Sequence, residues 1–483
     1  MYLKKLFDKA VKLHHLRKYK EAINIYKKIL KSDPDNIVIL NNFGSALNSQ
    51  ENFKLALNFF NKALLIKPEY IDALNNKAIS LKSLGQFEEA LSIYDTIIKF
   101  NPNNDNALNN KANCLRELGK YIEALNYYQD SININPKNYL YYYNCGICFY
   151  LMKEFHKAEE FYKKSIHLNP NFVESNYNLS LLQLLLGNYD DGWKNYEWRK
   201  KRNLKKRFII FKNEIDWLGD KDLKDKTIYI SKEQALGDYI QYARYLPIIK
   251  NLGANLILDT PEPLIPMINS MNFEYTHTNE LKKIDFNFHC SIASLPLAFK
   301  TKIDSIPSKI PYFFTPIEKK NFWEKKIPNN DKKKIGIKWS GNPNYKDDKN
   351  RSISLKYLKP LFELPIDFHS LHIEYNLEDI KLLNQINNLH CHKDFIKGLD
   401  NTAGLIEAMD LVISVDTGIV QLTGALGKNI WIMLPFISDH RWLLDRIDSP
   451  WFPTAKLYRQ TKNNDWENII NNIKKDLIKL IQL

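Results

Sequence analysis

A repeat of 34 residues in the first 170 positions constrains the fold of this 483-residue chain more than any other feature. Each of five units carries alanine, an aromatic residue four positions later and proline twelve positions after the alanine. The alanines are Ala22, Ala56, Ala90, Ala124 and Ala158. The aromatics are Tyr26, Phe60, Tyr94, Tyr128 and Tyr162, and the prolines are Pro34, Pro68, Pro102, Pro136 and Pro170. A period of this length predicts helix pairs that stack into an α-solenoid.

Each repeated position has a physical reason. Two helices cross closely only where a side chain is small, so alanine recurs at one point, and the aromatics fill the space beside the next pair. Proline ends the second helix because it lacks an amide proton and clashes with the preceding turn. The array resembles the tetratricopeptide repeat family. A sixth unit keeps Gly187 and Tyr189 but has Gly192 in place of alanine and Leu204 in place of proline, so we interpret it as a transition to another domain.

Asparagine also recurs with this period, in the first helix of successive units: Asn42, Asn76, Asn110, Asn144 and Asn178. An amide side chain donates and accepts hydrogen bonds, so such a ladder is able to pair with the backbone of an extended peptide. A similar ladder is known in the repeats of O-GlcNAc transferases. The alternative is that asparagine is simply common at this position of the repeat. The ladder by itself does not decide between a peptide groove and a plain scaffold.

After residue 211 the period is lost and strand patterns alternate with helix patterns. The expected strands are 227–231, 255–259, 334–340, 410–415 and 429–434, and the expected helices are 239–246, 418–426 and 466–483. Strands that alternate with helices predict parallel, doubly wound sheets. We expect a repeat domain at 1–204, two Rossmann-like lobes at 213–325 and 326–460, and a final helix at 461–483.

Four segments of the second half resemble a known enzyme family. They are Gln234-Ala235-Leu236-Gly237-Asp238 with the helix to Pro247, Trp339-Ser340-Gly341-Asn342-Pro343 with Asp348–Ser352, Ser414–Gly418 with Gly424–Lys428, and Arg441–Arg446 with Ser449–Pro453. They are similar to bacterial repeat-fused glycosyltransferases, which are relatives of the heptosyltransferases of glycosyltransferase family 9. The resemblance implies the two-lobed GT-B fold and transfer of a sugar from a nucleotide-sugar. Flagellin-modifying members imply a protein acceptor, such as flagellin or another surface protein, held by the repeats.

The resemblance also implies roles for particular residues. Asp238 matches the aspartate thought to be the general base, which takes the proton of the acceptor hydroxyl. Residues that orient the acceptor or the sugar are expected to be Gln234, Gly237, Gln241 and Arg244. Residues that bind the donor phosphate or sugar are expected to be Ser340, Asn342, Lys349, Asn350, Arg351, Asp416, Thr417, Gly418 and Gln421. The chain departs from the family at Gln421, where histidine is common, and at Ala235, where glycine is common.

Chemistry supports the same assignment independently. The phosphate of a departing nucleotide must be neutralised, and GT-B enzymes usually use helix N-termini and basic or hydroxyl side chains for this purpose. Lys349 and Arg351 supply positive charge, and Asp416 suits sugar hydroxyls better than phosphate because like charges repel. The structural alternative for Asp238 and for Asp416-Thr417 is an ordinary helix cap. We expect no metal or cofactor, since the nucleotide-sugar is a substrate.

Composition limits the remaining possibilities. The five cysteines are few and odd in number, which favours a reduced cytoplasmic setting, and Cys145 and Cys148 are expected to pack in a helix. The formal charge of +14 comes from scattered lysines, with one cluster between Arg199 and Arg207 that we interpret as a solvated helix end; nucleic acid is therefore not an expected partner. His390-Cys391-His392 lacks further ligands at a suitable spacing for zinc. No apolar stretch is long enough to cross a membrane.

Three functions remain open at this stage. The first is a glycosyltransferase that acts on a protein acceptor. The second is a glycosyltransferase with a glycan or lipid-linked acceptor, in which the repeats recruit partners. The third is a non-catalytic repeat scaffold, against which the presence of Asp238, Arg351 and Asp416 argues. The sequence leaves the nucleotide base, the sugar, the acceptor and the oligomeric state undetermined.

Overall fold

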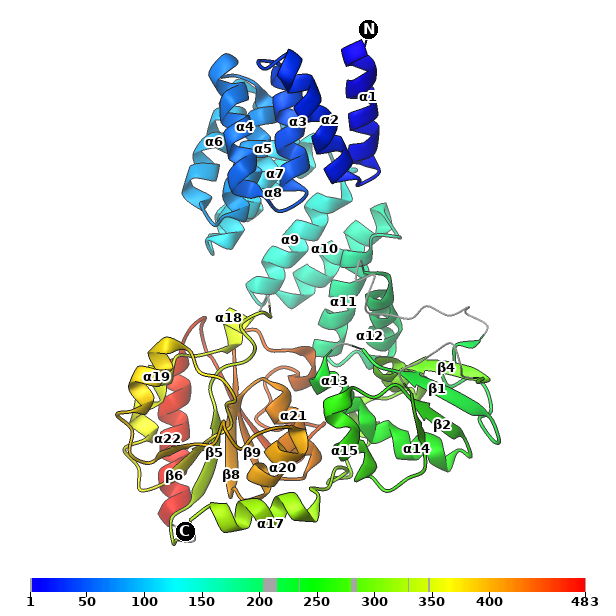
Figure 1. The fold of residues 1–483 in the computed structure, drawn as a ribbon, viewed down its shortest axis with the longest axis vertical. Helices are drawn as coiled ribbons and strands as arrows, with labels where there is room; N and C mark the ends of the chain where they lie inside the picture. The colour runs from blue at the N-terminus through cyan, green and yellow to red at the C-terminus, as the bar shows by residue number, and fades with distance from the viewer. Residues whose placement is uncertain are drawn as a thin grey trace. The chain divides into compact units, whose positions relative to one another are not determined.

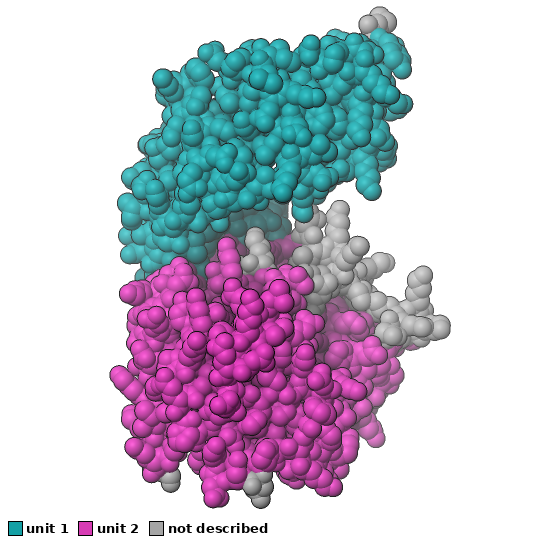
Figure 2. Space-filling model, turned by 60° about the vertical axis from the view of Figure 1, so that its left-hand side comes forward, with its two compact units in different colours: residues 1–176 teal, residues 177–483 magenta. Residues whose placement is uncertain are grey.

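The chain forms two compact units, residues 1–176 and 177–483, which Figure 2 colours separately. This computed structural model describes residues 2–202, 215–233, 235–278, 285–328, 330–345 and 348–482. The division between the units lies before residue 204, where the end of the repeats is expected, so most of the sixth helix pair packs with the second unit.

The first unit is an α-solenoid of antiparallel helix pairs, which run from blue to cyan in Figure 1. The repeats comprise α1 Tyr2–His15, α2 Tyr19–Ser32, α3 Ile37–Asn48, α4 Phe53–Ile66, α5 Ile71–Ser83, α6 Phe87–Phe100, α7 Asp105–Glu117, α8 Tyr121–Ile134, α9 Tyr139–Leu151, α10 Phe155–Leu168, α11 Val173–Leu185 and α12 Tyr189–Tyr196. From α2 to α10, every even-numbered helix ends two residues before a periodic proline. The repeat pattern therefore predicts the helix ends correctly.

The periodic alanines lie where the helices cross. All five alanines are fully buried, and the periodic aromatics are 0–2% exposed. The close crossing is visible at Gly146, where an added Cβ would lie 2.6 Å from the ring of Tyr162. Cys145 and Cys148 are buried on α9, and burial raises the pKa of both thiols, with that of Cys148 at about 11. Both therefore pack as small apolar residues, as expected.

The sixth helix pair becomes part of the second unit's core. Gly192 lets α12 approach α11, because a Cβ at this position would lie 2.7 Å from the Cδ2 atom of Leu184. The ring of Trp193 makes edge contacts with Tyr242, His440 and Trp451, which are far from Trp193 in the sequence but belong to the second unit. The glycine that replaces the periodic alanine thus marks the pair that joins the α/β core.

The second unit contains two parallel sheets among the described residues. The first sheet has the strand order β3-β2-β1-β4. Its elements are β1 Thr227–Ser231, α13 Leu236–Tyr242, α14 Leu246–Asn251, β2 Asn255–Leu258, α15 Ile265–Asn269, β3 Thr276–His277, β4 Phe288–Ser291 and α16 Leu295–Ala298. Strand β1 pairs in parallel with β2 on one side and with β4 on the other, with Ile230 opposite Leu258 and Cys290.

The second sheet has the strand order β10-β9-β8-β5-β6-β7. Its elements are α17 Ile317–Lys326, β5 Lys334–Lys338, α18 Asp348–Arg351, β6 Asp367–Ser370, α19 Leu377–Leu383, β7 Leu389–Cys391, α20 Leu399–Glu407, β8 Leu411–Val415, α21 Gly418–Ala425, β9 Ile430–Leu434, β10 Ala455–Arg459 and α22 Trp466–Gln482. Helices α20 and α21 pack on one face and α22 on the other (Figure 1).

This architecture is α/β, as the alternation of elements predicts. The expected strands and helices lie within about two residues of their predicted bounds, with one exception. The helix expected at 239–246 begins earlier, at Leu236, and is divided between α13, a short 3₁₀ turn and the start of α14. Strands β3, β4, β6, β7 and β10 have two to five residues and no long apolar run to reveal them. None of the helices in the described ranges is long and apolar enough to span a bilayer.

Candidate functional site

The predicted residues gather at the carboxyl ends of the central strands. In an open parallel sheet, ligands bind where the strand order reverses. In the second sheet this point lies between β5 and β8, and in the first sheet it lies between β1 and β4. The loops that leave β5, β8 and β1 carry most of the residues expected to bind substrate.

The loop after β5 is held in shape around Asp348. The carboxylate of Asp348 accepts hydrogen bonds from Arg351 Nε at 3.0 Å and from Ser352 Oγ at 2.6 Å, and Ser352 Oγ accepts one from the Gly341 amide at 2.8 Å. A Cβ on Gly341 would lie 2.2 Å from Asp348 Oδ1. Only glycine therefore allows this close approach.

Arg351 connects this loop to the loop after β8. Its Nη1 atom donates to the backbone carbonyl of Asp416 at 2.8 Å. The side chain of Asp416 accepts a hydrogen bond from Trp442 Nε1 at 2.7 Å. Burial raises the pKa of Asp416, and the positive charges of Arg441 and Arg351 oppose that rise. Arg351 thus joins the loop after β5 to the loop after β8.

Thr417 and Gly418 begin helix α21. Thr417 occupies the N-cap position, but its side chain makes no capping hydrogen bond and instead lies 3.3 Å from Ser414 Oγ. Gly418 is exposed, with open space where a Cβ would be. The ordinary capping interpretation therefore does not account for Thr417, and the start of α21 remains accessible.

Asp238 lies in the first turn of α13, where Ala235 and not Asp238 is the N-cap. Its Oδ1 atom accepts a hydrogen bond from Arg441 Nη2 at 2.9 Å, so the ion pair joins the two lobes. None of the described residues donates to Asp238 Oδ2. Arg441 also donates from Nε to Asp439 at 2.8 Å. Arg441 therefore orients Asp238 and leaves one carboxylate oxygen open.

The segment that carries Arg441 has an unusual backbone. Leu443 is 5% exposed and has φ of 53°, in the left-handed region that favours glycine. A non-glycine residue held there costs on the order of 1–3 kcal/mol and persists only where surrounding contacts enforce it. Arg459 supplies one such contact by donating to the Trp442 carbonyl. The strained turn places both Arg441 and Trp442 against aspartates of the site.

A buried ion network supports the loop after β1. Arg199 is 4% exposed and donates to the carboxylate of Glu233 from Nε at 3.1 Å and from Nη2 at 2.7 Å, and it also pairs with Glu197. Ser291 and Ser294 at the end of β4 complete the network. Despite burial, the charges of Arg199 and Lys200 lower the pKa of Glu197 to about 2. The solvated-end interpretation is wrong for Arg199, and residues 203–207 of that cluster lie outside the described part.

The other predicted donor residues differ in exposure. Ser340 is half-buried, and Asn342, Lys349 and Asn350 are exposed on the loop after β5. Gln421 lies inside α21, opposite Gly237 of α13, where a Cβ on Gly237 would lie 3.4 Å from Gln421 Cγ. Gln241 and Gln421 are 0% and 1% exposed, and neither amide has a partner among the described residues. Gln234 lies outside the described residues.

Arg244 is placed away from the exposed loops. It is 4% exposed and donates to the carbonyls of Gln241, Pro307 and Trp451 at 2.8, 3.1 and 2.7 Å. Its guanidinium also stacks on the rings of Tyr312, Trp451 and Phe452. Arg244 therefore connects α13 to the segment before β10 by hydrogen bonds. No hydrogen bond joins Arg244 to Asp238 in the described part of the chain.

The asparagine ladder forms hydrogen bonds between successive repeats. Asn76, Asn110 and Asn144 donate from Nδ2 to Asn41, Asn75 and Asn109 at 2.9, 3.2 and 2.8 Å, whereas Asn42 donates to the Val38 carbonyl. None of the described residues donates to the Oδ1 atoms of Asn76, Asn110 and Asn144. The ladder therefore has a structural role, and its acceptor atoms remain available. Asn178 lies in the part of α11 that belongs to the second unit.

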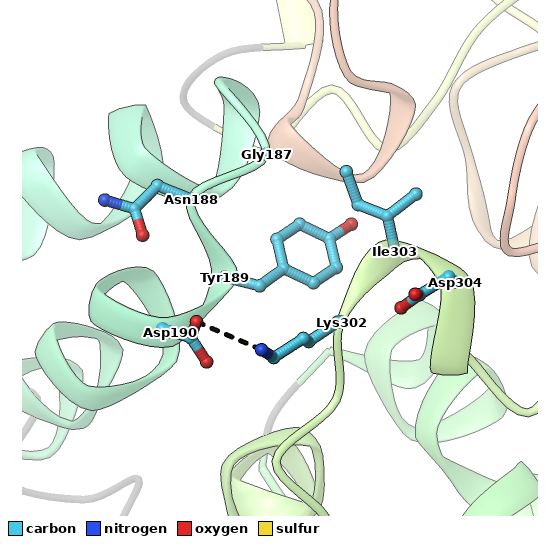
Figure 3. Close-up of a pocket in the computed structure, with 7 residues that line it drawn as sticks. All are labelled: Gly187, Asn188, Tyr189, Asp190, Lys302, Ile303 and Asp304. Atoms are coloured by element: carbon cyan, nitrogen blue, oxygen red, sulfur yellow. Dashed lines mark ion pairs between the residues drawn. The ribbon is translucent and has the colours of Figure 1, made fainter.

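A cavity of about 310 Å³ lies elsewhere in the second unit, and its lining contains none of the predicted site residues (Figure 3). It lies between the start of α12 and the turn at 302–304, beside an exposed ion pair of Asp190 and Lys302 at 3.5 Å.

The histidine pair near the end of β6 does not form part of a metal cluster in the described part of the chain. His369 and His392 are buried and joined by a 2.9 Å hydrogen bond. Within the described ranges, no three histidine, cysteine, aspartate or glutamate side chains are grouped closely enough to hold a metal.

Three residues of the site escaped the sequence prediction. They are Arg441, which lies in one of the four resembling segments, Arg199, which the basic run places at the surface, and Lys338, which ends β5 beside Trp339. The sequence contains a weak indication that Arg441 and Lys338 belong to the site. Lys338 ends the apolar strand β5, Arg441 follows the apolar strand β9, and the carboxyl ends of these strands lie at the same edge of the sheet. Arg199 left no such signal, since its partners Glu233 and Ser294 are 34 and 95 residues away.

Comparison with known families supports the assignment of the repeats. Family models of the tetratricopeptide repeat match residues 6–36, 37–70, 69–137, 103–168 and 161–194. The first unit and the sixth helix pair therefore carry tetratricopeptide repeats.

Known proteins resemble the chain more distantly. Protein FlbA of Caulobacter vibrioides is 23% identical over 318 residues, which cover 60% of this chain and 52% of FlbA, so the chain spans about half the length of this curated relative. Among solved structures, YrrB, a TPR protein with an unusual peptide-binding site, is 24% identical with a TM-score of 0.30 over 36% of this chain and 89% of that chain. A repeat protein from Parabacteroides merdae is 20% identical with a TM-score of 0.35 over 41% and 79%.

Proposed function

We propose that this protein is an inverting glycosyltransferase of the GT-B fold that uses a nucleotide-sugar. The observation that carries the proposal is the convergence of the loops after β5 and β8 at the point of strand reversal, through the 2.8 Å contact of Arg351 with Asp416. Phosphates bind at such points because helix N-termini and cationic side chains face them. Arg351, Lys349 and the accessible start of α21 supply these groups, and no metal is assigned a role.

In the proposed reaction, Asp238 is the general base. Its free oxygen Oδ2 takes the proton of the acceptor hydroxyl as that oxygen attacks the anomeric carbon. The bond between the anomeric carbon and the phosphate oxygen breaks, and its electron pair leaves with the nucleotide. Arg351 and the amides of α21 compensate the negative charge that develops on the phosphate. Attack from the face opposite the leaving group inverts the anomeric configuration.

The proposed acceptor is a protein held by the repeats, with flagellin or another surface protein as the first candidates. The inter-repeat hydrogen bonds of the asparagine ladder favour a second candidate. Since those amides already have a structural partner, the repeats are also suited to serve as a scaffold that recruits partners. In that case the acceptor is a glycan or a lipid-linked sugar.

A panel of nucleotides and nucleotide-sugars tests the transferase proposal. The full chain is expected to bind at least one of UDP, GDP, dTDP, ADP and CMP with micromolar to millimolar affinity in calorimetry. The chain is also expected to hydrolyse the nucleotide-sugar that contains this nucleotide, or to transfer its sugar to an acceptor. Mass spectrometry of surface proteins from cells with and without the gene identifies a protein acceptor by a missing sugar mass. A chain that binds none of these nucleotides would contradict the proposal and favour the non-catalytic scaffold.

Substitution of the ladder separates the two acceptor candidates. Replacement of Asn76, Asn110 and Asn144 by alanine removes three inter-repeat hydrogen bonds and is expected to destabilise the first unit by about 0.5–1.5 kcal/mol for each bond. Replacement of their acceptors Asn41, Asn75 and Asn109 is the matched control, because it breaks the same bonds. If the ladder binds a peptide, only the first variant loses acceptor-protein binding. Equal binding by both variants would exclude the peptide role and favour the second candidate.

A further inference from the structure

Lys338 is a basic residue at the converging loops to which no role has been assigned. It is half-buried and is the last residue of β5, opposite Ser414 of β8 in the parallel register. Successive strand residues point to opposite faces. Ile335 and Ile337 pack in the core that contains α22. The side chain of Lys338 therefore points to the other face, with Gly336, where α20 and α21 lie.

Among the described residues, the side chain within hydrogen-bonding distance of Lys338 Nζ does not compensate the charge of this lysine. The Nζ atom lies 3.5 Å from Nδ1 of His372. The Trp339 amide donates to Nε2 of the same ring at 3.1 Å, so Nε2 carries no proton and the neutral ring must carry its proton on Nδ1. Nδ1 is therefore unable to accept a hydrogen bond from a lysine ammonium.

Among the described residues, the charged neighbours of Lys338, Asp348 and Arg351, leave a net excess of positive charge. In the described part of the chain, Asp348 is the carboxylate whose charge acts on Lys338, but its oxygens accept hydrogen bonds from Arg351 and Ser352 and form no ion pair with Lys338. None of the described residues forms an ion pair with Lys338, and Arg351 adds a like charge. Burial is the main cause that lowers the pKa of Lys338 to about 8, with Asp348 opposing the shift and Arg351 adding to it. Burial together with the positive charge of Lys338 also keeps His372 neutral, because its pKa lies well below the usual value.

We propose that Lys338 is a third cation of the phosphate site, partly neutral when the site is empty and protonated when the phosphate of a nucleotide binds. This inference rests on the proposed function, since it assumes that the phosphate lies at the loops after β5 and β8. A dianionic phosphate supplies the acceptors that His372 and Asp348 do not offer. Nucleotide binding is then coupled to the uptake of a proton from solvent.

The direction of the pH dependence follows from linkage. Below pH 7 the ammonium is formed in both states, and binding takes up almost no proton at Lys338. Above pH 8 the free protein has lost the proton, whereas the complex keeps it. The affinity therefore falls as pH rises through 8, by up to about tenfold per pH unit until the pKa of the complex is reached.

Calorimetry measures this coupling directly. Binding of whichever of UDP, GDP, dTDP, ADP and CMP is recognised is measured at pH 8.0 in buffers of different ionisation enthalpy. The wild-type chain is expected to take up about 0.5 proton per nucleotide. The variant Lys338→Arg stays charged at this pH and is expected to bind without that uptake. The variant Lys338→Met is expected to lose both the uptake and about tenfold or more of the affinity.

A second measurement needs no nucleotide. The rate at which an amine-reactive reagent modifies Lys338 follows its neutral fraction, and mass spectrometry of the modified peptide gives that rate at each pH. The midpoint is expected near pH 8, in contrast to about 10.4 for ordinary lysines. A midpoint near 10.4, or equal proton uptake by wild type and Lys338→Arg, would overturn the inference and leave the transferase proposal intact. A midpoint near 8 in a chain that binds no nucleotide would support an uncompensated lysine but contradict its assignment to a nucleotide phosphate, together with the proposed function.

Discussion

Replacement of Asp238 by asparagine is expected to lower the rate of sugar transfer by about 10²–10⁴-fold, because asparagine cannot accept the proton of the acceptor hydroxyl. The fold should survive, since an amide oxygen still accepts the hydrogen bond from Arg441 that Asp238 Oδ1 receives at 2.9 Å. Nucleotide affinity is expected to change by no more than a few-fold, because the residues proposed to bind the phosphate lie on the loops after β5 and β8. Transfer kinetics, calorimetry and thermal unfolding check these three outcomes.

The matched control for this variant is Asp439→Asn. Asp439 also accepts a hydrogen bond from Arg441, at 2.8 Å, but belongs to the segment after β9. If Asp238 acts only by neutralising Arg441, both variants lose a similar part of the activity. If Asp238 is the base, the asparagine variant at position 238 loses far more. A fully active Asp238→Asn enzyme would remove Asp238 from the mechanism.

Replacement of Arg199 by methionine is expected to destabilise the second unit by about 3–5 kcal/mol, the usual effect of leaving a buried charge without its partner. The substitution removes the arginine partner of Glu233 and Glu197, whose side chains are 11% and 20% exposed. Because Glu233 lies five residues before Asp238, the loop that carries the proposed base should also loosen. Denaturant unfolding gives the stability change. Hydrogen exchange in the peptide that spans residues 228–240 reports the loosening of the loop.

Arg446→Met provides the comparison for a surface ion pair. Arg446 pairs with Asp448 at 2.6 Å, but the two side chains are 37% and 59% exposed. Such pairs contribute about 0–1 kcal/mol, so this variant should unfold almost as the wild type does. The double variant Arg199→Met, Glu233→Gln should recover part of the stability, since one stranded charge is removed. If Arg199→Met lowers the free energy of unfolding no more than Arg446→Met does, burial does not make the Arg199 ion pairs important for stability.

These two predictions differ in how much the sequence contributes to them. Asp238 was identified from its place between a buried strand and a helix, together with the resemblance of the surrounding residues. Its partner Arg441 is 203 residues away, and nothing local in the sequence relates the two. The same holds for Arg199, whose position in a basic run favoured the surface until its contacts with Glu233 and Ser294 were known.

Local and periodic properties were therefore determined by the sequence alone. The helix ends, the buried alanines and aromatics of the solenoid, and the parallel α/β character of the second half follow from short-range spacing, because backbone hydrogen bonding and side-chain size act within a few residues. Only the tertiary structure decided which charges are paired and where the sixth repeat belongs. It turned the asparagines of the ladder toward neighbouring repeats, buried Arg244 and left Lys338 without a carboxylate partner among the described residues. Charge compensation depends on distances between residues remote in sequence, and those distances exist only after the sheets and helices have packed.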